Sequence, residues 1–135
     1  LFANDKPELF DDALVFLERL RAAGHRVLIV SNNPRTLNQV PLLGLESQID
    51  GVFTPHNTPG TLPKPDRSMW DYIVRQNLDV DPENTTVVGD DPWSEGSFAA
   101  TCGLHCWIVD RLDRFSKLSD APTYQRVRSL LEIPV

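Results

Sequence analysis

The chain has 135 residues, a length typical of one domain, and a formal net charge of −6. This acidic balance argues against a nucleic-acid-binding protein, because such proteins cluster basic residues on one face; here they are scattered, with one small cluster at Arg126 and Arg128. No apolar run approaches the roughly 20 residues of a membrane span, and no signal peptide is recognisable. Cys102 and Cys106 lack a metal-type spacing, so we expect buried, reduced thiols in a cytoplasmic protein.

Helices and strands are predicted to alternate along the chain, because apolar residues recur first at helical and then at strand-like spacing. The predicted elements are, in order, helix 11–23, strand 26–31, helix 36–43, strand 49–54, helix 66–78, strand 85–89, helix 94–102, strand 104–109 and a tail helix 122–131. Short connections between alternating elements predict an α/β fold with a three-layer, Rossmann-like, doubly wound parallel sheet. We expect one domain over residues 1–135.

Local signals mark the ends of several predicted helices. The first helix carries an apolar stripe at Leu14, Leu17 and Leu20 and is closed by Gly24. The two aspartates at its start, residues 11 and 12, fit helix capping, as does Asp66 before the third helix. These signals predict where each helix begins and ends.

Polar groups follow two of the apolar runs at the point where each run stops. Val27–Val30 is followed by Ser31-Asn32-Asn33, and Thr85–Val88 is followed by Gly89-Asp90-Asp91. Between them, Lys64 precedes a helical segment. Ligands of open α/β sheets bind outside the carboxyl ends of the strands, so these groups are expected to converge on one crevice. A hydroxyl, an ammonium and two carboxylates suit an anionic substrate and a divalent cation.

The order of these motifs resembles the haloacid dehalogenase-like (HAD) hydrolase superfamily over about Ala13 to Asp110. The resemblance implies that the Ser31 hydroxyl and the Asn32 backbone N–H hold a phosphoryl oxygen. It implies that Lys64 neutralises the charge of the nucleophile and the phosphate during phosphoryl transfer. Ser31, Lys64 and Asp90 are thus the candidate catalytic residues.

The same resemblance implies a Mg²⁺ site with Asp90 as ligand, and with Asp91 and Glu95 as further candidates. Two alternatives stay open. The two aspartates can cap the following helix, since acids are favourable at helix N-termini. Glu95 stands where the family commonly has a second aspartate, and it can support the metal or pair with Lys64.

The family's first motif, an Asp-x-Asp pattern whose aspartate attacks phosphorus, has no counterpart here. Asp5 has only four residues before it, too few for a buried strand. Leu1–Asn4 instead resembles the stretch that follows this motif in relatives, and the chain begins with leucine rather than methionine. We therefore expect the nucleophile and its strand to lie upstream, and the chain as given to be inactive without them.

No cap domain is expected, because the 30 residues between Asn33 and Lys64 already hold a helix, a strand and a loop. The resemblance is then to capless members, whose open sites serve large phosphorylated substrates or are closed by a neighbouring subunit. We expect the substrate to be phosphorylated, and it can be a macromolecule. A homo-oligomer, in which a neighbouring subunit closes the site, is also compatible with the absence of a cap. Trp93, Trp70 and the loop 56–62 are candidates for the rim, and a position in the core is an equally open alternative for the tryptophans.

The leading hypothesis is a Mg²⁺-dependent phosphomonoester hydrolase that acts through an aspartyl-phosphate. A dehalogenase is disfavoured, because that chemistry needs no metal-binding carboxylates. A non-catalytic binding or regulatory module with the same scaffold is the alternative, and the missing nucleophile supports it. A phosphorelay receiver domain is disfavoured by the order of Ser31 and Lys64. The three histidines, His25, His56 and His105, do not form a ligand set.

Overall fold

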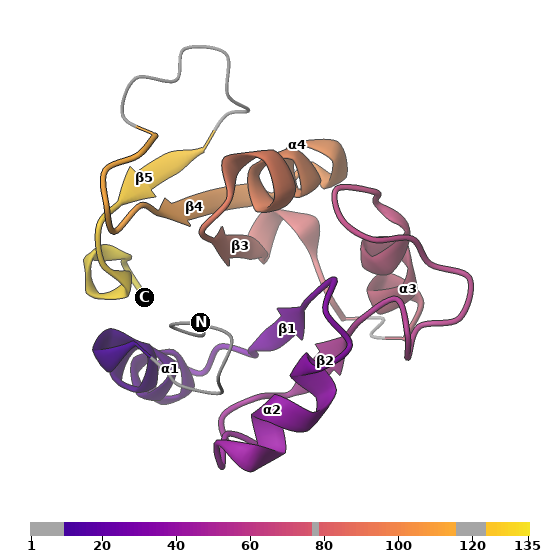
Figure 1. Cartoon of the computed structure of the whole chain (residues 1–135), viewed down its shortest axis with the longest axis horizontal. Coiled ribbons are helices and arrows are strands. Elements are labelled where there is room, and N and C mark those ends of the chain that lie inside the picture. The colour runs from indigo at the N-terminus through magenta and orange to yellow at the C-terminus, as the bar shows by residue number, and fades with distance from the viewer. Residues whose placement is uncertain (1–9, 77–78, 116–123) are drawn as a thin grey trace.

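The structure is a computed structural model that describes residues 10–76, 79–115 and 124–135. Its helices are α1 (Asp11–Ala22), α2 (Thr36–Leu42), α3 (Ser68–Gln76) and α4 (Ser97–Cys102) (Figure 1). Its strands are β1 (Leu28–Val30), β2 (Gly51–Phe53), β3 (Thr86–Gly89), β4 (His105–Val109) and β5 (Gln125–Val127). Short 3-10 turns cover Pro82–Asn84 and Leu130–Glu132, and a π-helical turn covers Pro92–Gly96. Each helix and strand predicted before residue 110 is present, most with slightly shorter bounds, and the start of the predicted helix 94–102 lies in the π-helical turn. Residues 77 and 78, the end of the predicted helix 66–78, lie outside the described residues.

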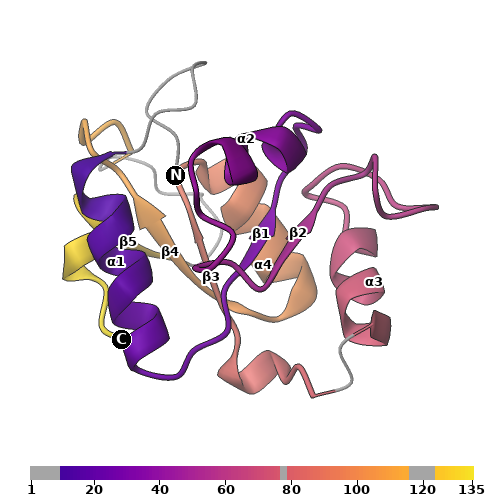
Figure 2. The same cartoon turned by 90° about the horizontal axis from the view of Figure 1, so that it is seen from below.

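The strands form two parallel ladders. β1 pairs with β2 in the register Ile29 to Val52, and β3, β4 and β5 pair in that order, with Val88 opposite Trp107 and Ile108 opposite Arg126. The arrows of β1, β2 and β4 run toward the same edge of the molecule (Figure 2). The carboxyl ends of both ladders, where polar residues were expected to gather, therefore share one edge.

Helices cover both faces of the strands and give the predicted three layers. On one face, α3 and α4 pack with β1, β2, β3 and β4 in a single core that includes Ile73, Phe98 and Ile108. On the other face, α1 contributes Phe16 to a core with β4 and the C-terminal turn, and Leu17 to a core with β1, β2 and α2. Each helical layer thus contacts both ladders, which makes the two ladders parts of one strand layer.

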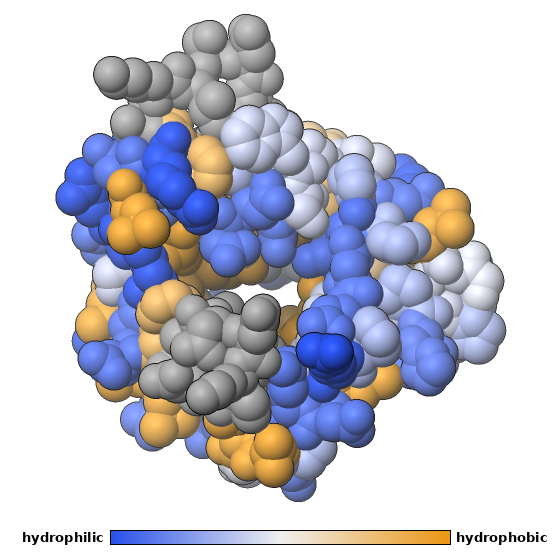
Figure 3. Space-filling model, in the orientation of Figure 1, coloured by the Kyte–Doolittle hydropathy of each residue, from blue (hydrophilic) through white to orange (hydrophobic). Residues whose placement is uncertain are grey.

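Within the described residues, no strand lies between β1 and β3. Among the described residues, β1 is hydrogen-bonded to β2 alone and β3 to β4 alone, so their facing edges are unpaired. The space-filling view shows an opening at this place (Figure 3). The apolar run Leu28–Val30 is consequently only half-buried, and Val88 is 38% exposed. A run of this composition is typical of a strand that has neighbours on both sides.

Two predictions about the ends of the chain are wrong. Within the described part of the predicted tail helix, Gln125–Val127 is a strand and Leu130–Glu132 is a 3-10 turn, while residues 122 and 123 lie outside the described residues. Pairing of this segment with β4 outweighs its helical periodicity, as tertiary context often does. Of the apolar stripe predicted for α1, Leu17 is buried and Leu20 packs against the core, but Leu14 is 43% exposed. Residues 12, 13 and 16 complete the buried face.

Asp12 does not cap α1, contrary to expectation. Phe10 is the N-cap residue of this helix, and it makes no side-chain capping bond. The Asp12 side chain is buried and accepts two hydrogen bonds from Arg111, at 2.9 Å each, one from the Ser129 hydroxyl at 2.8 Å and one from Leu130 N at 2.9 Å. This carboxylate joins the first described helix to the C-terminal turn.

Within the described part of the chain, no helix is long and apolar enough to cross a bilayer. Cys102 and Cys106 are both buried free thiols, as predicted. Burial raises the pKa of each to about 11, and the nearby charge of Glu95 adds to the effect at Cys106. Both thiols therefore stay protonated at neutral pH.

Candidate functional site

Ser31 directly follows β1, and its hydroxyl is held in place by the start of α2. Ser31 N donates to Phe53 O at 2.9 Å, which extends the pairing of β1 with β2. The Ser31 Oγ accepts from Thr36 Oγ1 at 2.9 Å and from Asn33 N at 3.1 Å. A hydroxyl oxygen accepts two such bonds and still keeps its own proton to donate. Its remaining contact, to Asn33 O at 3.5 Å, is at the limit of a hydrogen bond.

Asn32 fixes the backbone of Lys64 with two hydrogen bonds. Asn32 Nδ2 donates to Lys64 O at 3.1 Å, and Asn32 Oδ1 accepts from Lys64 N at 2.7 Å. The amide pairs with the peptide group much as a neighbouring strand would. This side-chain role was missed by sequence reasoning, which assigned Asn32 only a backbone N–H. The bonds hold the loop before α3 against the end of β1.

Lys64 forms an ion pair with Glu95. Lys64 Nζ lies 3.3 Å from Glu95 Oε1, and the two side chains are 7% and 18% exposed. Of the two alternatives for Glu95, the structure thus contains the contact with Lys64. The other carboxylate oxygen, Glu95 Oε2, is buried and has no hydrogen-bond partner in the part of the chain that the structure describes. A buried carboxylate oxygen without a partner is costly, so it marks a place where a further positive or donor group is favourable.

Glu95 reaches Lys64 by crossing directly over Gly89, the last residue of β3. A Cβ at residue 89 would lie 2.1 Å from Glu95 Cγ and 2.5 Å from Glu95 Cβ. Neither atom is at the free end of the side chain, so a methyl group there cannot be accommodated without moving Glu95. Glycine at this position is therefore required for the Lys64–Glu95 contact.

We expect Gly89→Ala to displace Glu95 and destabilise the protein by about 1–3 kcal/mol, the usual cost of an overpacked site. Urea unfolding measures this loss. The double variant Gly89→Ala/Glu95→Ala removes the clashing atoms and should recover part of it. Equal unfolding midpoints for wild type and Gly89→Ala would contradict the crossing of Glu95 over Gly89.

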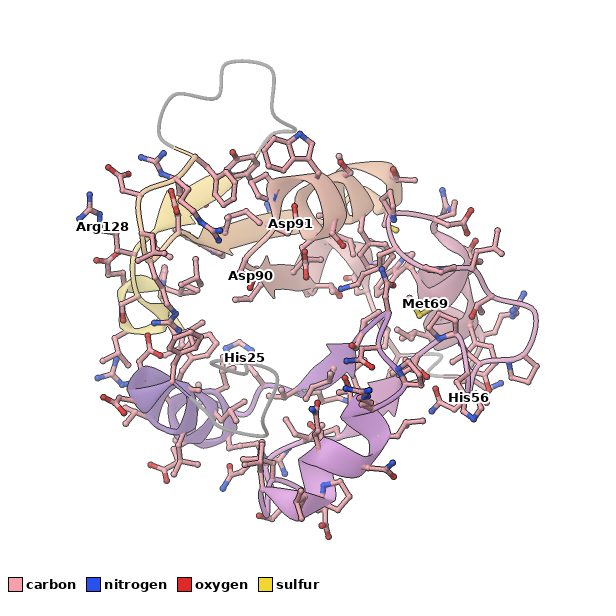
Figure 4. All side chains as sticks on the ribbon, in the orientation of Figure 1. His25, His56, Met69, Asp90, Asp91 and Arg128 are labelled. Atoms are coloured by element: carbon pink, nitrogen blue, oxygen red, sulfur yellow. The ribbon has the colours of Figure 1, made fainter. Side chains whose placement is uncertain are left out.

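Asp90 and Asp91 follow β3 and have different surroundings. Asp91 Oδ1 accepts from Trp93 N at 2.9 Å and Ser94 N at 3.3 Å, so it caps the π-helical turn Pro92–Gly96. Asp90 is exposed, lies beside the space between the two ladders (Figure 4), and makes no hydrogen bond or ion pair among the described residues. The capping alternative thus describes Asp91, and Asp90 keeps a free carboxylate.

The donor set at this edge fits a hard cation such as Mg²⁺. Within the described ranges, no group of three or more His, Cys, Asp or Glu side chains is placed to hold a metal ion. Mg²⁺ is commonly held by one or two carboxylates and keeps several waters, so the free Asp90 carboxylate and the partnerless oxygen of Glu95 suit it. The metal roles of Asp90, Asp91 and Glu95 remain predictions.

One series of contacts connects the predicted site residues. Ser31 is followed by Asn32, whose amide holds Lys64, and Lys64 pairs with Glu95, which crosses Gly89 immediately before Asp90. Ser31 directly follows β1 and Asp90 directly follows β3, the two strands that border the space. The arrangement combines a hydroxyl, an ammonium and a free carboxylate, groups able to bind a phosphate and a cation.

The predicted rim is only partly present. Trp70 is 5% exposed and belongs to the core between α3 and α4, so of its two alternatives the core position is correct and the rim position is wrong. Its position next to Met69 and one turn before Ile73 places it on the buried face of α3. Trp93, by contrast, is 56% exposed, and Leu62 in the loop before Lys64 is 58% exposed.

A family model described as haloacid dehalogenase-like hydrolase matches residues 1–103. No curated protein matches the sequence. Among solved structures, a HAD phosphatase from Thermococcus onnurineus is similar, with a TM-score of 0.80 and 24% identity over 93% of this chain and 56% of that chain. YfnB from Bacillus subtilis, solved bound to magnesium, has a TM-score of 0.81 and 21% identity over 93% of this chain and 54% of its own.

A 2-haloacid dehalogenase from Pseudomonas syringae is also similar, with a TM-score of 0.75 and 19% identity over 91% of this chain and 50% of that chain. At these identities the structural likeness shows the fold alone. The chain spans about half the length of these three relatives. Because the family model matches 103 of the 135 residues, this chain belongs to the haloacid dehalogenase-like hydrolases.

Proposed function

We propose that this chain forms most of the core of a Mg²⁺-dependent phosphomonoester hydrolase. The observation that supports this best is the contact series from Ser31 through Asn32, Lys64 and Glu95 to the position before Asp90. It lines the carboxyl edge of an open α/β sheet, where such folds bind ligands. The free carboxylate of Asp90 favours phosphate chemistry over dehalogenation, which needs no metal-binding acid.

The nucleophile is an aspartate carried on a further parallel strand between β1 and β3. The unpaired edges of these two strands and the opening between them support this placement (Figure 3). A carboxylate that follows such a strand would lie at the same edge as Ser31 and Asp90. Its oxygen forms a bond to phosphorus while the ester oxygen leaves with its electron pair, and water then releases phosphate from the aspartyl-phosphate.

The residues of this chain position and neutralise the transferring group. The Ser31 hydroxyl and Asn32 N–H bind a phosphoryl oxygen, and the Lys64 ammonium offsets the charge of the phosphate and the attacking carboxylate. Glu95 and Asn32 keep Lys64 in place. Asp90 would hold Mg²⁺, with Asp91 or Glu95 as a second ligand. A cation held there would supply further charge neutralisation for the transferring group.

Metal removal tests this function directly. The chain joined to the upstream segment that carries the nucleophile should release phosphate from p-nitrophenyl phosphate when Mg²⁺ is present. EDTA should abolish the release and added Mg²⁺ should restore it, because Asp90 acts through the cation. Undiminished activity in EDTA would overturn the metal assignment. Absence of any phosphatase activity in that protein would favour the non-catalytic module instead.

A further inference from the structure

Trp93 is an exposed aromatic side chain beside the candidate site. Its exposed fraction is 56%, whereas Trp70 is buried and Trp107 is half-buried. An indole presents a large apolar surface together with one hydrogen-bond donor, a combination that is enriched at binding surfaces. Trp93 lies two residues after Asp91 and two before Glu95, so its position relative to the site is set by the same turn.

The π-helical turn Pro92–Gly96 leaves Trp93 exposed and brings Glu95 to Lys64. Asp91 Oδ1 accepts from Trp93 N at 2.9 Å, and Glu95 N donates to Asp91 O at 2.9 Å. The Glu95 side chain then turns over Gly89 to Lys64. Wide turns of this kind are frequent at functional sites. The backbone of Trp93 is therefore fixed by the carboxylate next to the proposed metal ligand.

Phe115 and Arg114 extend this surface. The rings of Trp93 and Phe115 meet edge to face with centroids 5.4 Å apart and an interplanar angle of 77°. The Arg114 guanidinium lies 5.2 Å from the centroid of the Phe115 ring. The loop is held by Asp110, which is 2% exposed and accepts from Arg114 N at 2.8 Å and Phe115 N at 2.9 Å. Phe115 also packs against the core of α3 and α4.

We infer that Trp93 and Phe115 form an aromatic ledge that receives a planar aromatic leaving group of the phosphomonoester substrate. This inference rests on the proposed function, since it names the substrate class of the same site. The ledge adjoins the Asp91 end of the site. Asp91 fixes the backbone of Trp93, and the buried Asp110 fixes the backbone of Phe115. Binding of a ligand therefore costs little conformational entropy in these two residues. An aromatic ring binds more favourably there than an alkyl group of similar size, because two aromatic rings in contact gain interaction energy in addition to that from their buried area.

Two phosphonates that differ only in the leaving-group mimic test the ledge. Phenylphosphonate and methylphosphonate both carry the charged head, and their P–C bond is not hydrolysed. Each is titrated, with Mg²⁺ present, into the chain joined to the upstream segment that carries the nucleophile. Inorganic phosphate is titrated in the same way, and the Trp93 indole N–H is followed by NMR. We expect phenylphosphonate to bind more tightly than methylphosphonate and to shift the Trp93 signal.

Variants then assign the preference to Trp93. Trp93→Ala should weaken phenylphosphonate binding by about two- to ten-fold, the range expected for one aromatic pair, and leave methylphosphonate binding unchanged. Trp93→Phe should retain most of the preference. Leu42→Ala, which removes an apolar side chain that is 73% exposed on α2, is the matched control and should change neither.

The outcomes separate this inference from the proposed function. Equal binding of the two phosphonates, or an unchanged preference in Trp93→Ala, would overturn the ledge while phosphate binding still supports the hydrolase. Failure of inorganic phosphate and both phosphonates to bind would overturn the two together. A preference that is lost in Trp93→Ala and kept in Trp93→Phe would support the aromatic leaving group.

Discussion

In the chain joined to the upstream segment that carries the nucleophile, Asp90→Asn is expected to lower Mg²⁺-dependent phosphate release by about 100-fold or more, because electrostatic groups at the reacting centre contribute on this scale. Asparagine keeps the size of the side chain and removes its charge, and Asp90 makes no described hydrogen bond or ion pair whose loss would disturb the fold. Steady-state assays with p-nitrophenyl phosphate measure the rate, and calorimetric titration with Mg²⁺ measures metal binding in the same protein.

Asp91→Asn discriminates between the two neighbouring carboxylates. Its Oδ1 accepts from Trp93 N and Ser94 N, and an asparagine Oδ1 can accept the same bonds, so the turn is kept. A small effect of Asp91→Asn on phosphate release and Mg²⁺ binding would assign the metal to Asp90. A loss of both as large as that caused by Asp90→Asn would assign the metal to both aspartates. Glu46→Gln, an exposed acid after α2, is the control for charge alone. Full activity of Asp90→Asn would refute its role.

Asp12→Asn is expected to destabilise the protein by about 3 kcal/mol, the scale on which a buried ion pair loses one partner. The substitution leaves the Arg111 guanidinium without its carboxylate and weakens the bonds from Ser129 and Leu130 N. Urea unfolding measures the loss. Asp71→Asn removes the exposed pair with Arg67 and, as a matched control, should cost less than about 0.5 kcal/mol. Equal losses would contradict the structural role of Asp12.

The difference between wild type and Asp12→Asn should also depend on pH. Burial raises the pKa of Asp12, but hydrogen bonds from Arg111, Ser129 and Leu130 outweigh it and lower the pKa from 3.8 to about 2. A lowered pKa contributes stability that is fully present above 3.8 and is lost as the pH falls through 2. The difference in free energy of unfolding between wild type and Asp12→Asn should therefore decrease by about 2 kcal/mol from pH 5 to pH 2. A gap independent of pH would rule out this ion pair as its source.

The order of elements up to residue 109 could be predicted because it depends on local periodicity. Apolar runs such as Val27–Val30 form strands wherever helices cover both faces, and polar residues at their ends mark the shared edge. The positions of Ser31 and Asp90 at that edge followed from this rule alone. The contact between Lys64 and Glu95 was one of two alternatives, and only side-chain geometry could choose it.

Contacts between distant residues could not be predicted. Asp12 and Leu130 are 118 positions apart, and helix capping was the nearer explanation for an acid at a helix start. The tail was assigned to a helix because the segment 122–131 is amphipathic at helical spacing, but pairing with β4 decides the structure of Gln125–Val127. Asn32 gave one usable signal: an amide after a strand-end serine is well suited to bind a neighbouring peptide group.

The open space between β1 and β3 has a mechanical consequence for catalysis. Ser31 and Asn32 follow a strand of one ladder and Asp90 a strand of the other. The proposed phosphate-binding and metal-binding halves therefore share no strand pairing there among the described residues. A strand that enters the space would bond to both halves at once. The same strand would then bring the attacking carboxylate to the site and fix the distance between the bound phosphate and the cation.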